Sequence, residues 1–164
     1  MRNQIWTNLC NTQFKSYLFD IRIDNLQRTD RTINLIIAIT SSGSIASWAY
    51  WQTHIEIWGA IIALSQVITA IRPLFPYTRY VKELSAKKMK LDLLSLDFQK
   101  LLRDFDNNKI SRDIISTKYD DLTKELTTTL NFSDETIISF NKKSINKANE
   151  KMKLFFKTNY SISI

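Results

Sequence analysis

Glycine, proline, cysteine and histidine are almost missing from this chain of 164 residues. It contains two glycines, two prolines, one cysteine and one histidine. Because β-rich folds need turn residues at short intervals, the scarcity of glycine and proline excludes an all-β fold and favours an all-α one. The single Cys10 excludes an internal disulfide and a cysteine-based zinc site. Two glycines cannot build a phosphate-cradling loop, and His54 has no partner at metal-ligand spacing. We therefore expect no enzyme activity, no metal site and no cofactor.

Charged residues are missing from two neighbouring stretches. None occurs from Thr32 to Ile55 or from Ile57 to Ile71. A helix rises about 1.5 Å per residue, so roughly 20 apolar residues cross a hydrocarbon core about 30 Å thick. The sequence therefore predicts a two-span transmembrane helical hairpin over residues 32–75, with spans at about 32–51 and 55–74. A buried helical hairpin in a water-soluble protein is the alternative.

Positive charge flanks this hairpin and is missing from its turn. The chain is basic, with 23 Lys and Arg against 16 Asp and Glu, a net charge of +7. Lys15, Arg22, Arg28 and Arg31 precede the first span, and Arg72, Arg79, Lys82, Lys87, Lys88 and Lys90 follow the second. Short loops rich in Lys and Arg stay in the cytoplasm. We therefore expect a multi-pass protein of the bacterial inner membrane with both termini in the cytoplasm.

The rest of the chain has the apolar periodicity of helices. Residues 1–31 are predicted to form an amphipathic N-terminal helix that either packs on the other cytoplasmic helices or lies on the membrane. Residues 76–164 are predicted to form a cytoplasmic helical and coiled-coil region with helices at about 77–105, 111–130 and 134–157.

A heptad pattern runs along the first of these cytoplasmic helices. Apolar residues recur at alternating steps of three and four, and Lys87 is the one exception. Such a seam is typical of coiled coils. It predicts a homo-oligomer, held together in part by Leu84, Leu91, Leu94, Phe98 and Leu101.

Small and polar residues form a stripe along the second predicted span. Glu56, Gly59, Ala63, Gln66 and Ala70 follow steps of three and four, and Thr40, Ser44 and Ser47 form a similar face on the first span. Small residues allow close helix packing in lipid, and an uncompensated amide at mid-bilayer should face protein or water. The stripes either hold helices together or line a pore, with Gln66 the strongest candidate.

Lysines gather in the last predicted helix. Lys142, Lys143, Lys147 and Lys151 lie close together, and the aromatic residues Phe140, Phe156 and Tyr160 precede and follow them. Lysine and aromatic side chains can hold the phosphates and bases of a nucleotide or a single-stranded oligonucleotide. A lipid-facing or solvated helix surface is the alternative, and no stable binding of duplex DNA is expected.

The hairpin with its minimal turn, its basic lead-in helix and the long helix that follows it resembles SLATT-domain proteins, which are two-helix membrane effectors of bacterial nucleotide-signalling defence systems. The resemblance covers about residues 14–106 and includes the stretch from Arg28-Thr29-Asp30-Arg31 through Pro73-Leu74-Phe75-Pro76. It implies an oligomeric pore that permeabilises or depolarises the inner membrane in antiphage defence. The implied trigger is a nucleotide or oligonucleotide, or a nucleotidyltransferase-like partner that makes one.

Two other functions fit the same pattern. A membrane-anchored helical scaffold would use the hairpin as an anchor and conduct nothing. A phage holin-like lesion former would also perforate the membrane, but holins rarely need so large a cytoplasmic helical region.

Overall fold

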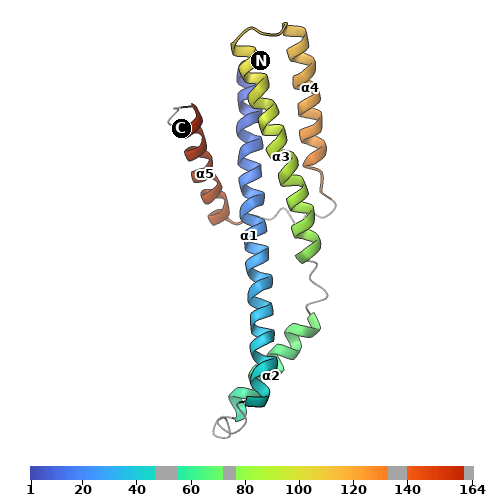
Figure 1. Ribbon diagram of the computed structural model, residues 1–164, viewed down its shortest axis with the longest axis vertical. Coiled ribbons are helices and arrows are strands. Elements are labelled where there is room, and N and C mark those ends of the chain that lie inside the picture. The colour runs from blue at the N-terminus through green and yellow to red at the C-terminus, as the bar shows by residue number, and fades with distance from the viewer. Residues whose placement is uncertain (47–54, 72–76, 133–139, 161–164) are drawn as a thin grey trace. The chain divides into compact units, whose positions relative to one another are not determined.

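The described part of the chain folds into helices (Figure 1). The structure is a computed structural model that describes residues 1–46, 55–71, 77–132 and 140–160. Its helices are α1 (Arg2–Ala46), α2 (Ile55–Ile71), α3 (Tyr77–Asp106), α4 (Arg112–Thr129) and α5 (Lys142–Tyr160). The described residues form no strand, which confirms the predicted all-α fold. Over those same residues, none of the helices combines the length and the apolar character needed to cross a bilayer.

The chain divides into two compact units. Unit 1 consists of Met1–Ile23 and Lys82–Ile164, and unit 2 consists of Asp24–Val81. The predicted domains had their boundaries at residues 31 and 75 instead. The boundary at 31 falls inside α1, which is continuous because neither glycine nor proline interrupts the sequence before Gly43.

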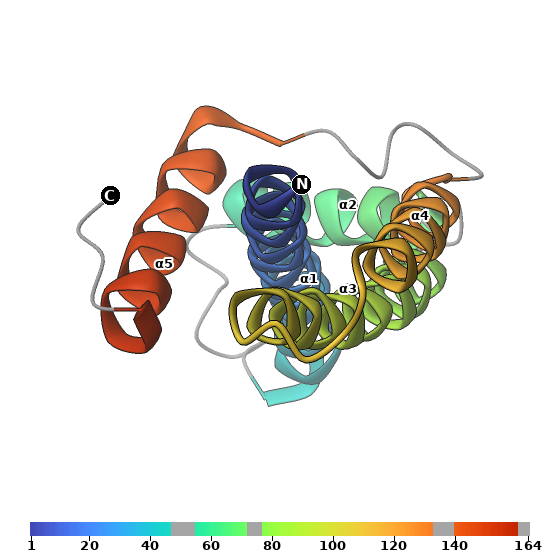
Figure 2. The ribbon, with the colours of Figure 1, turned by 90° about the horizontal axis from the view of Figure 1, so that it is seen from above.

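In unit 1, α1 lies between α5 on one side and the pair of α3 and α4 on the other (Figure 2). The N-terminus of α1 is joined to the C-terminus of α3 by an ion pair of 2.7 Å between Arg2 Nε and Asp106 Oδ1. Asn8 Nδ2 donates to the Tyr119 hydroxyl of α4 at 3.0 Å. The first half of α1 therefore packs on the other helices of unit 1, as one of the two expectations for it had proposed.

The heptad seam of α3 is buried inside one chain. Its five predicted residues are between 0 and 3% exposed: Leu84, Leu91, Leu94, Phe98 and Leu101. Buried side chains of α1, α4 and α5 complete this core, among them Ile5, Leu9, Phe19, Ile115, Leu126, Ala148 and Phe156. The predicted burial of the seam between helices is thus observed. Helices of the same chain already remove these side chains from water in a single copy. The predicted contact between subunits stays a prediction.

The boundaries of the later helices follow the sequence pattern with one difference. α3 and α4 begin and end within one residue of their predicted limits. Ser111 occupies the N-cap position of α4, although its side chain makes no capping hydrogen bond. The last helix was predicted from residue 134, but α5 begins at Lys142, and residues 133–139 lie outside the described part. Asn141 Oδ1 accepts a hydrogen bond from the Ser144 backbone N–H at 2.8 Å, which caps α5 at this later position.

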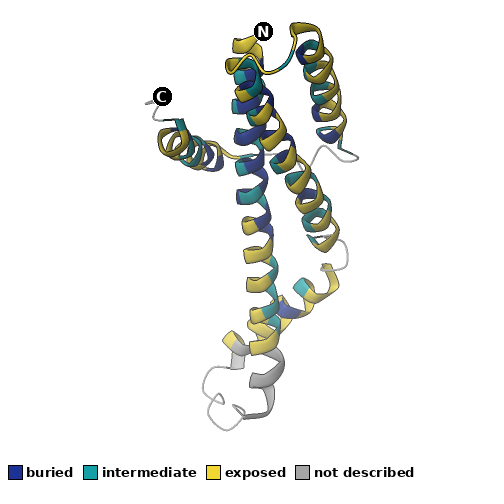
Figure 3. Ribbon diagram, turned by 45° about the horizontal axis from the view of Figure 1, so that its top comes forward, coloured by how far each residue is buried: buried dark blue, intermediate teal, exposed yellow. Residues whose placement is uncertain are grey.

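Unit 2 exposes its apolar side chains. Sixteen large apolar residues are exposed in the described part of the chain, and nine of them lie in unit 2: Leu35, Ile36, Ile39, Ile57, Ile61, Ile62, Leu64, Val67 and Ile71. Figure 3 shows the second half of α1 and the whole of α2 as mainly exposed, whereas the first half of α1 is largely buried. Among its described residues, unit 2 thus buries far fewer apolar side chains than unit 1.

Because the α3 seam forms the core of one chain, truncating it should destabilise the protein independently of concentration. We expect Leu94→Ala to lower the free energy of unfolding by about 2–5 kcal/mol, through lost burial and the cavity left behind. Leu154→Ala, which makes the same change at a residue 66% exposed, should alter it by about 0.5 kcal/mol or less. Thermal unfolding followed by circular dichroism at two protein concentrations measures both variants. If the loss of unfolding free energy in Leu94→Ala disappears at high protein concentration, the seam is a contact between subunits.

Candidate functional site

The predicted stripe of α2 lies on an exposed side of that helix. Glu56, Gly59, Ala63, Gln66 and Ala70 are all exposed. A Cβ atom added to Gly59 would meet nothing within 4 Å, so no other helix approaches closely there. The stripe is therefore not what holds the hairpin of one chain together, at least among the described residues.

The buried side of α2 is marked by Ser65, which is 6% exposed. Its hydroxyl donates to the Ile61 carbonyl of its own helix at 2.7 Å, so the polar group is satisfied without a second helix. At 100° per residue, Ala63 lies 200° around the helix from Ser65. The stripe and the packed side thus occupy nearly opposite faces of α2.

The second predicted stripe cannot be compared in the same way. Ser47 lies outside the described residues, and so do the side chains of Thr40 and Ser44. Near the start of this stretch, Asn34 Nδ2 donates to Asp30 Oδ2 one turn earlier at 3.1 Å. This bond supplies a local partner for one polar group of the charge-free stretch.

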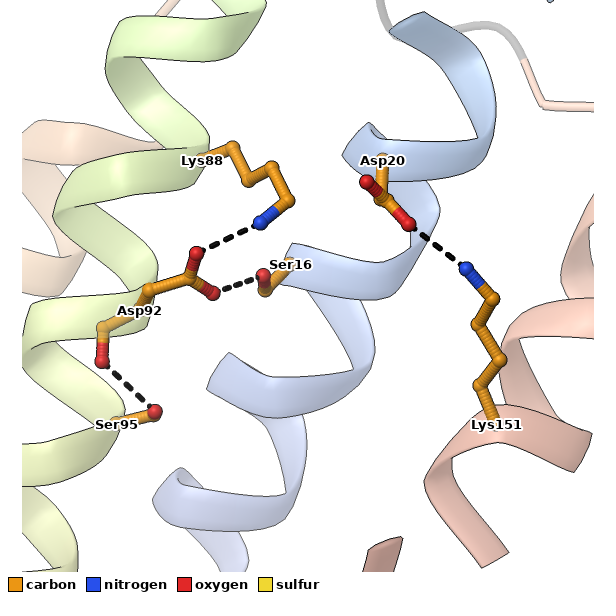
Figure 4. Close-up of polar contacts among 6 residues, drawn as sticks. All are labelled: Ser16, Asp20, Lys88, Asp92, Ser95 and Lys151. Atoms are coloured by element: carbon orange, nitrogen blue, oxygen red, sulfur yellow. Dashed lines mark hydrogen bonds and ion pairs between the residues drawn. The ribbon is translucent and has the colours of Figure 1, made fainter. Parts of the chain in front are cut away.

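The lysines of α5 separate into two groups. Lys142, Lys143 and Lys147 are exposed and make no ion pair with any residue that the structure describes. Lys151 instead donates to Asp20 Oδ2 of α1 at 2.7 Å and lies 5.9 Å from the centre of the Tyr17 ring (Figure 4). The predicted cluster of four is thus reduced to three, because Asp20 already neutralises the fourth.

A polar bridge joins α1 to α3 at the edge of the apolar core (Figure 4). The Ser16 hydroxyl, which is almost fully buried, donates to Asp92 Oδ1, and Lys88 Nζ donates to Asp92 Oδ2 at 2.7 Å. Ser95 donates to the Asp92 backbone carbonyl at 2.9 Å. The sequence analysis missed this bridge, because Ser16 and Asp92 are 76 positions apart and neither belongs to a local motif.

Lys87, the one exception in the heptad seam, serves the end of α4. Its ammonium donates to the Thr129 carbonyl at 3.0 Å and also to the Asn131 carbonyl, and it lies 4.3 Å from the centre of the Phe132 ring. The last carbonyls of a helix lack intrahelical partners and carry partial negative charge. A cation at this seam position therefore stabilises the neighbouring helix terminus.

A groove of about 450 Å³ opens where α1, α3 and α5 meet at one end of unit 1. It is lined by Arg2, Asn3, Trp6, Cys10, Leu102, Asp106, Met152 and Tyr160. Burial raises the pKa of the Cys10 thiol and of the Tyr160 hydroxyl above their usual values. The groove falls within the size range of small-molecule sites. Its thiol is shifted toward the protonated form rather than toward the reactive thiolate. No cluster of potential metal ligands occurs in the described residues.

Comparisons of this chain with protein-family models, with curated proteins and with solved structures found no match. The resemblance to SLATT-domain proteins therefore remains an expectation from the hairpin and its flanks.

Removing the ammonium of Lys87 should destabilise unit 1. We expect Lys87→Met to cost about 1–2 kcal/mol in the free energy of unfolding, because the Thr129 and Asn131 carbonyls lose a charged donor. Lys118→Met, which makes the same change at an exposed position of α4, is the matched control and should have little effect. Chemical unfolding of both variants measures the difference. Equal stability of the two would show that Lys87 is only a tolerated break in the seam.

Proposed function

We propose that this protein is an oligomeric membrane effector whose hairpin, at residues 32–75, enters the bacterial inner membrane and forms a pore. The observation that carries the proposal is the group of exposed apolar side chains in unit 2. Leu35, Ile39 and Leu64 are 59, 56 and 60% exposed in a single chain. Apolar surface left in water costs roughly 25 cal/mol per Å², and apolar patches of this extent usually mark membrane or protein interfaces.

Lipid is the cover that the charge distribution favours. The apolar residues belong to the two stretches without charge, and Lys and Arg lie on the outer sides of both. This is the pattern of a hairpin whose two ends remain in the cytoplasm. In the proposed arrangement the α3–α5 region is cytoplasmic as well.

The exposed stripe of α2 supports a conducting role. Glu56, Gly59, Ala63, Gln66 and Ala70 avoid the packed side of their own helix. In an oligomer they would face either another subunit or a central aqueous path. Gln66 would supply a polar group halfway along the path, and Glu56 would place a carboxylate near its outer mouth, favouring cations.

The trigger that we propose is a nucleotide or oligonucleotide bound at the start of α5. Lys142, Lys143 and Lys147 are exposed there, and the first turn of the helix contains no acidic residue. The N-terminus of a helix carries partial positive charge, so it adds to the field of these lysines. Activation by such a signal is the antiphage role that the resemblance to SLATT-domain effectors implies. A nucleotidyltransferase-like partner would be the source of the signal.

Replacing the amide in the stripe should abolish conduction while leaving assembly intact. We expect Gln66→Leu to remove ion flux through liposomes containing the purified full chain, because a dry apolar constriction resists wetting. Thr69→Leu is the matched control, since Thr69 lies off the stripe and its hydroxyl donates to the Ser65 carbonyl of its own helix. Ion flux is measured with a potential-sensitive dye, and oligomer size by light scattering in detergent.

The outcomes of this experiment separate the candidate functions. Flux lost only in Gln66→Leu supports a pore lined by α2. Equal loss of ion flux in Gln66→Leu and Thr69→Leu would indicate that α2 packs against other helices and does not line a pore. Absence of flux from the wild-type chain, with and without oligonucleotide, would leave the non-conducting scaffold, and a C-terminal reporter outside the cytoplasm would refute the hairpin.

Reversing charge at α5 should abolish the response to the trigger. We expect Lys143→Glu with Lys147→Glu to weaken binding of a short oligonucleotide, and wild-type binding itself to weaken steeply with salt because phosphate contacts release counterions. Lys118→Glu with Lys124→Glu makes the same change in net charge on α4 and should leave binding intact. Calorimetric titration in detergent without lipid measures binding apart from any attraction to anionic lipid. Absence of wild-type binding would refute the nucleotide trigger.

A further inference from the structure

The outer face of α3 carries a second apolar stripe. Met89, Leu93 and Leu96 are 62, 56 and 58% exposed, and Ala86 beside them is exposed too. They belong to unit 1, whose other exposed large apolar residues (Met1, Ile114, Ile145 and Leu154) are distributed over three other helices or helix ends. Three large apolar side chains on consecutive turns of one helix form a continuous surface that solitary exposed residues do not.

The spacing of this stripe is that of a second heptad seam. Steps of three, four and three connect Ala86, Met89, Leu93 and Leu96. The buried seam of the same helix, with Leu84, Leu91 and Phe98, lies on another side. α3 thus has one seam that its own chain covers and a shorter one that remains exposed among the described residues of unit 1. The shorter seam ends at Lys82 and Lys100.

The charged residues beside the exposed seam allow the seams of two copies of the chain to pair with each other. Lys90 and Asp97 lie on the same edge of it, one heptad apart, and both are exposed. Neither forms an ion pair with another described residue. When two such helices pack in opposite directions around a two-fold axis near Leu93 and Leu96, each Lys90 faces the Asp97 of the other copy.

Charged residues on and beside the same seam make a parallel pairing unfavourable. It would bring Lys100 of one helix against Lys100 of the other, and Asp92 toward Asp97 across the seam. In the antiparallel pairing, Leu93 packs against Leu96 of the other copy, and Lys100 extends past Met89. The charged edge also disfavours lipid as the cover, because an exposed carboxylate gains nothing from an apolar phase.

We propose that the α3 stripe of Ala86, Met89, Leu93 and Leu96 is an interface with a second copy of this chain, paired antiparallel to the same stripe. This inference does not depend on the hairpin entering a membrane or on any pore. The interface is small, and small interfaces of this kind are weak and transient. Neighbouring copies in an assembly would use it as a secondary contact.

Disulfide trapping tests the pairing directly. The full chain, purified in detergent with Cys10→Ser as background, is made in two tagged forms, Leu93→Cys and Leu96→Cys. The antiparallel pairing predicts that the mixed disulfide forms several times faster than either disulfide between like forms. Leu154→Cys, exposed on α5, measures the rate of random collision. Faster trapping between like forms would overturn the antiparallel arrangement, and trapping no faster than Leu154→Cys would overturn the interface.

Charge reversal provides an independent test with its own rescue. Lys90→Asp should slow the mixed disulfide by about tenfold, because two attractive pairs become two repulsive ones. Asp97→Lys should slow it similarly, and the double variant should restore the original rate. Lys118→Asp makes the same charge change away from the stripe and should have no effect. Failure of the double variant to restore trapping would refute the proposed pairs, whereas lost ion flux in the liposome experiment would leave this result unchanged.

Discussion

The docking of α1 against α3 is the interaction on which unit 1 depends. Together with α4 and α5, α1 completes the core in which Leu84, Leu91 and Phe98 of the α3 heptad seam are buried. Ser16 of α1 reaches Asp92 of α3 inside this contact, and Arg2 holds the two helix ends together at Asp106. Apolar burial supplies the stabilisation, and the two polar contacts fix the register, because a hydrogen-bonded pair tolerates little sliding.

α4 and α5 contact the pair of α1 and α3 through polar and aromatic side chains. Lys87 extends from the seam of α3 to the last carbonyls of α4. Lys151 joins α5 to Asp20 of α1, and Trp6 contacts Phe156 with ring centres 5.0 Å apart. Lys87 interrupts the apolar seam of α3, and Lys151 belongs to the predicted ligand-binding lysines. Both contact a neighbouring helix instead.

The two units differ in what they do with apolar residues. Unit 1 buries them within one chain, whereas unit 2 exposes Leu35, Ile39 and Leu64. A helix with exposed apolar side chains is stabilised when a medium or a second copy covers them. This stabilisation links the proposed membrane role of unit 2 to oligomerisation. The exposed seam of α3 presents the same situation on a smaller scale.

The sequence by itself determined the features that depend on neighbouring residues. The scarcity of glycine and proline predicted the helical fold that the described residues have. The three-four spacing of apolar residues placed α3 and α4 within one residue of their limits. Periodicity reports which face of a helix is apolar, since it depends only on the turn of 100° per residue. The exposed stripe of α2 was identifiable in the same way.

Only the tertiary structure decided which partner covers each face. The sequence could not show that α1 packs on α3 within the same chain. A heptad pattern looks the same whether its partner is another subunit or a helix 76 positions away. The same reason hid the pairing of Lys151 with Asp20 and the use of Lys87 at the end of α4. Contacts between distant segments depend on the packing of the whole unit, and no local pattern in the chain records them.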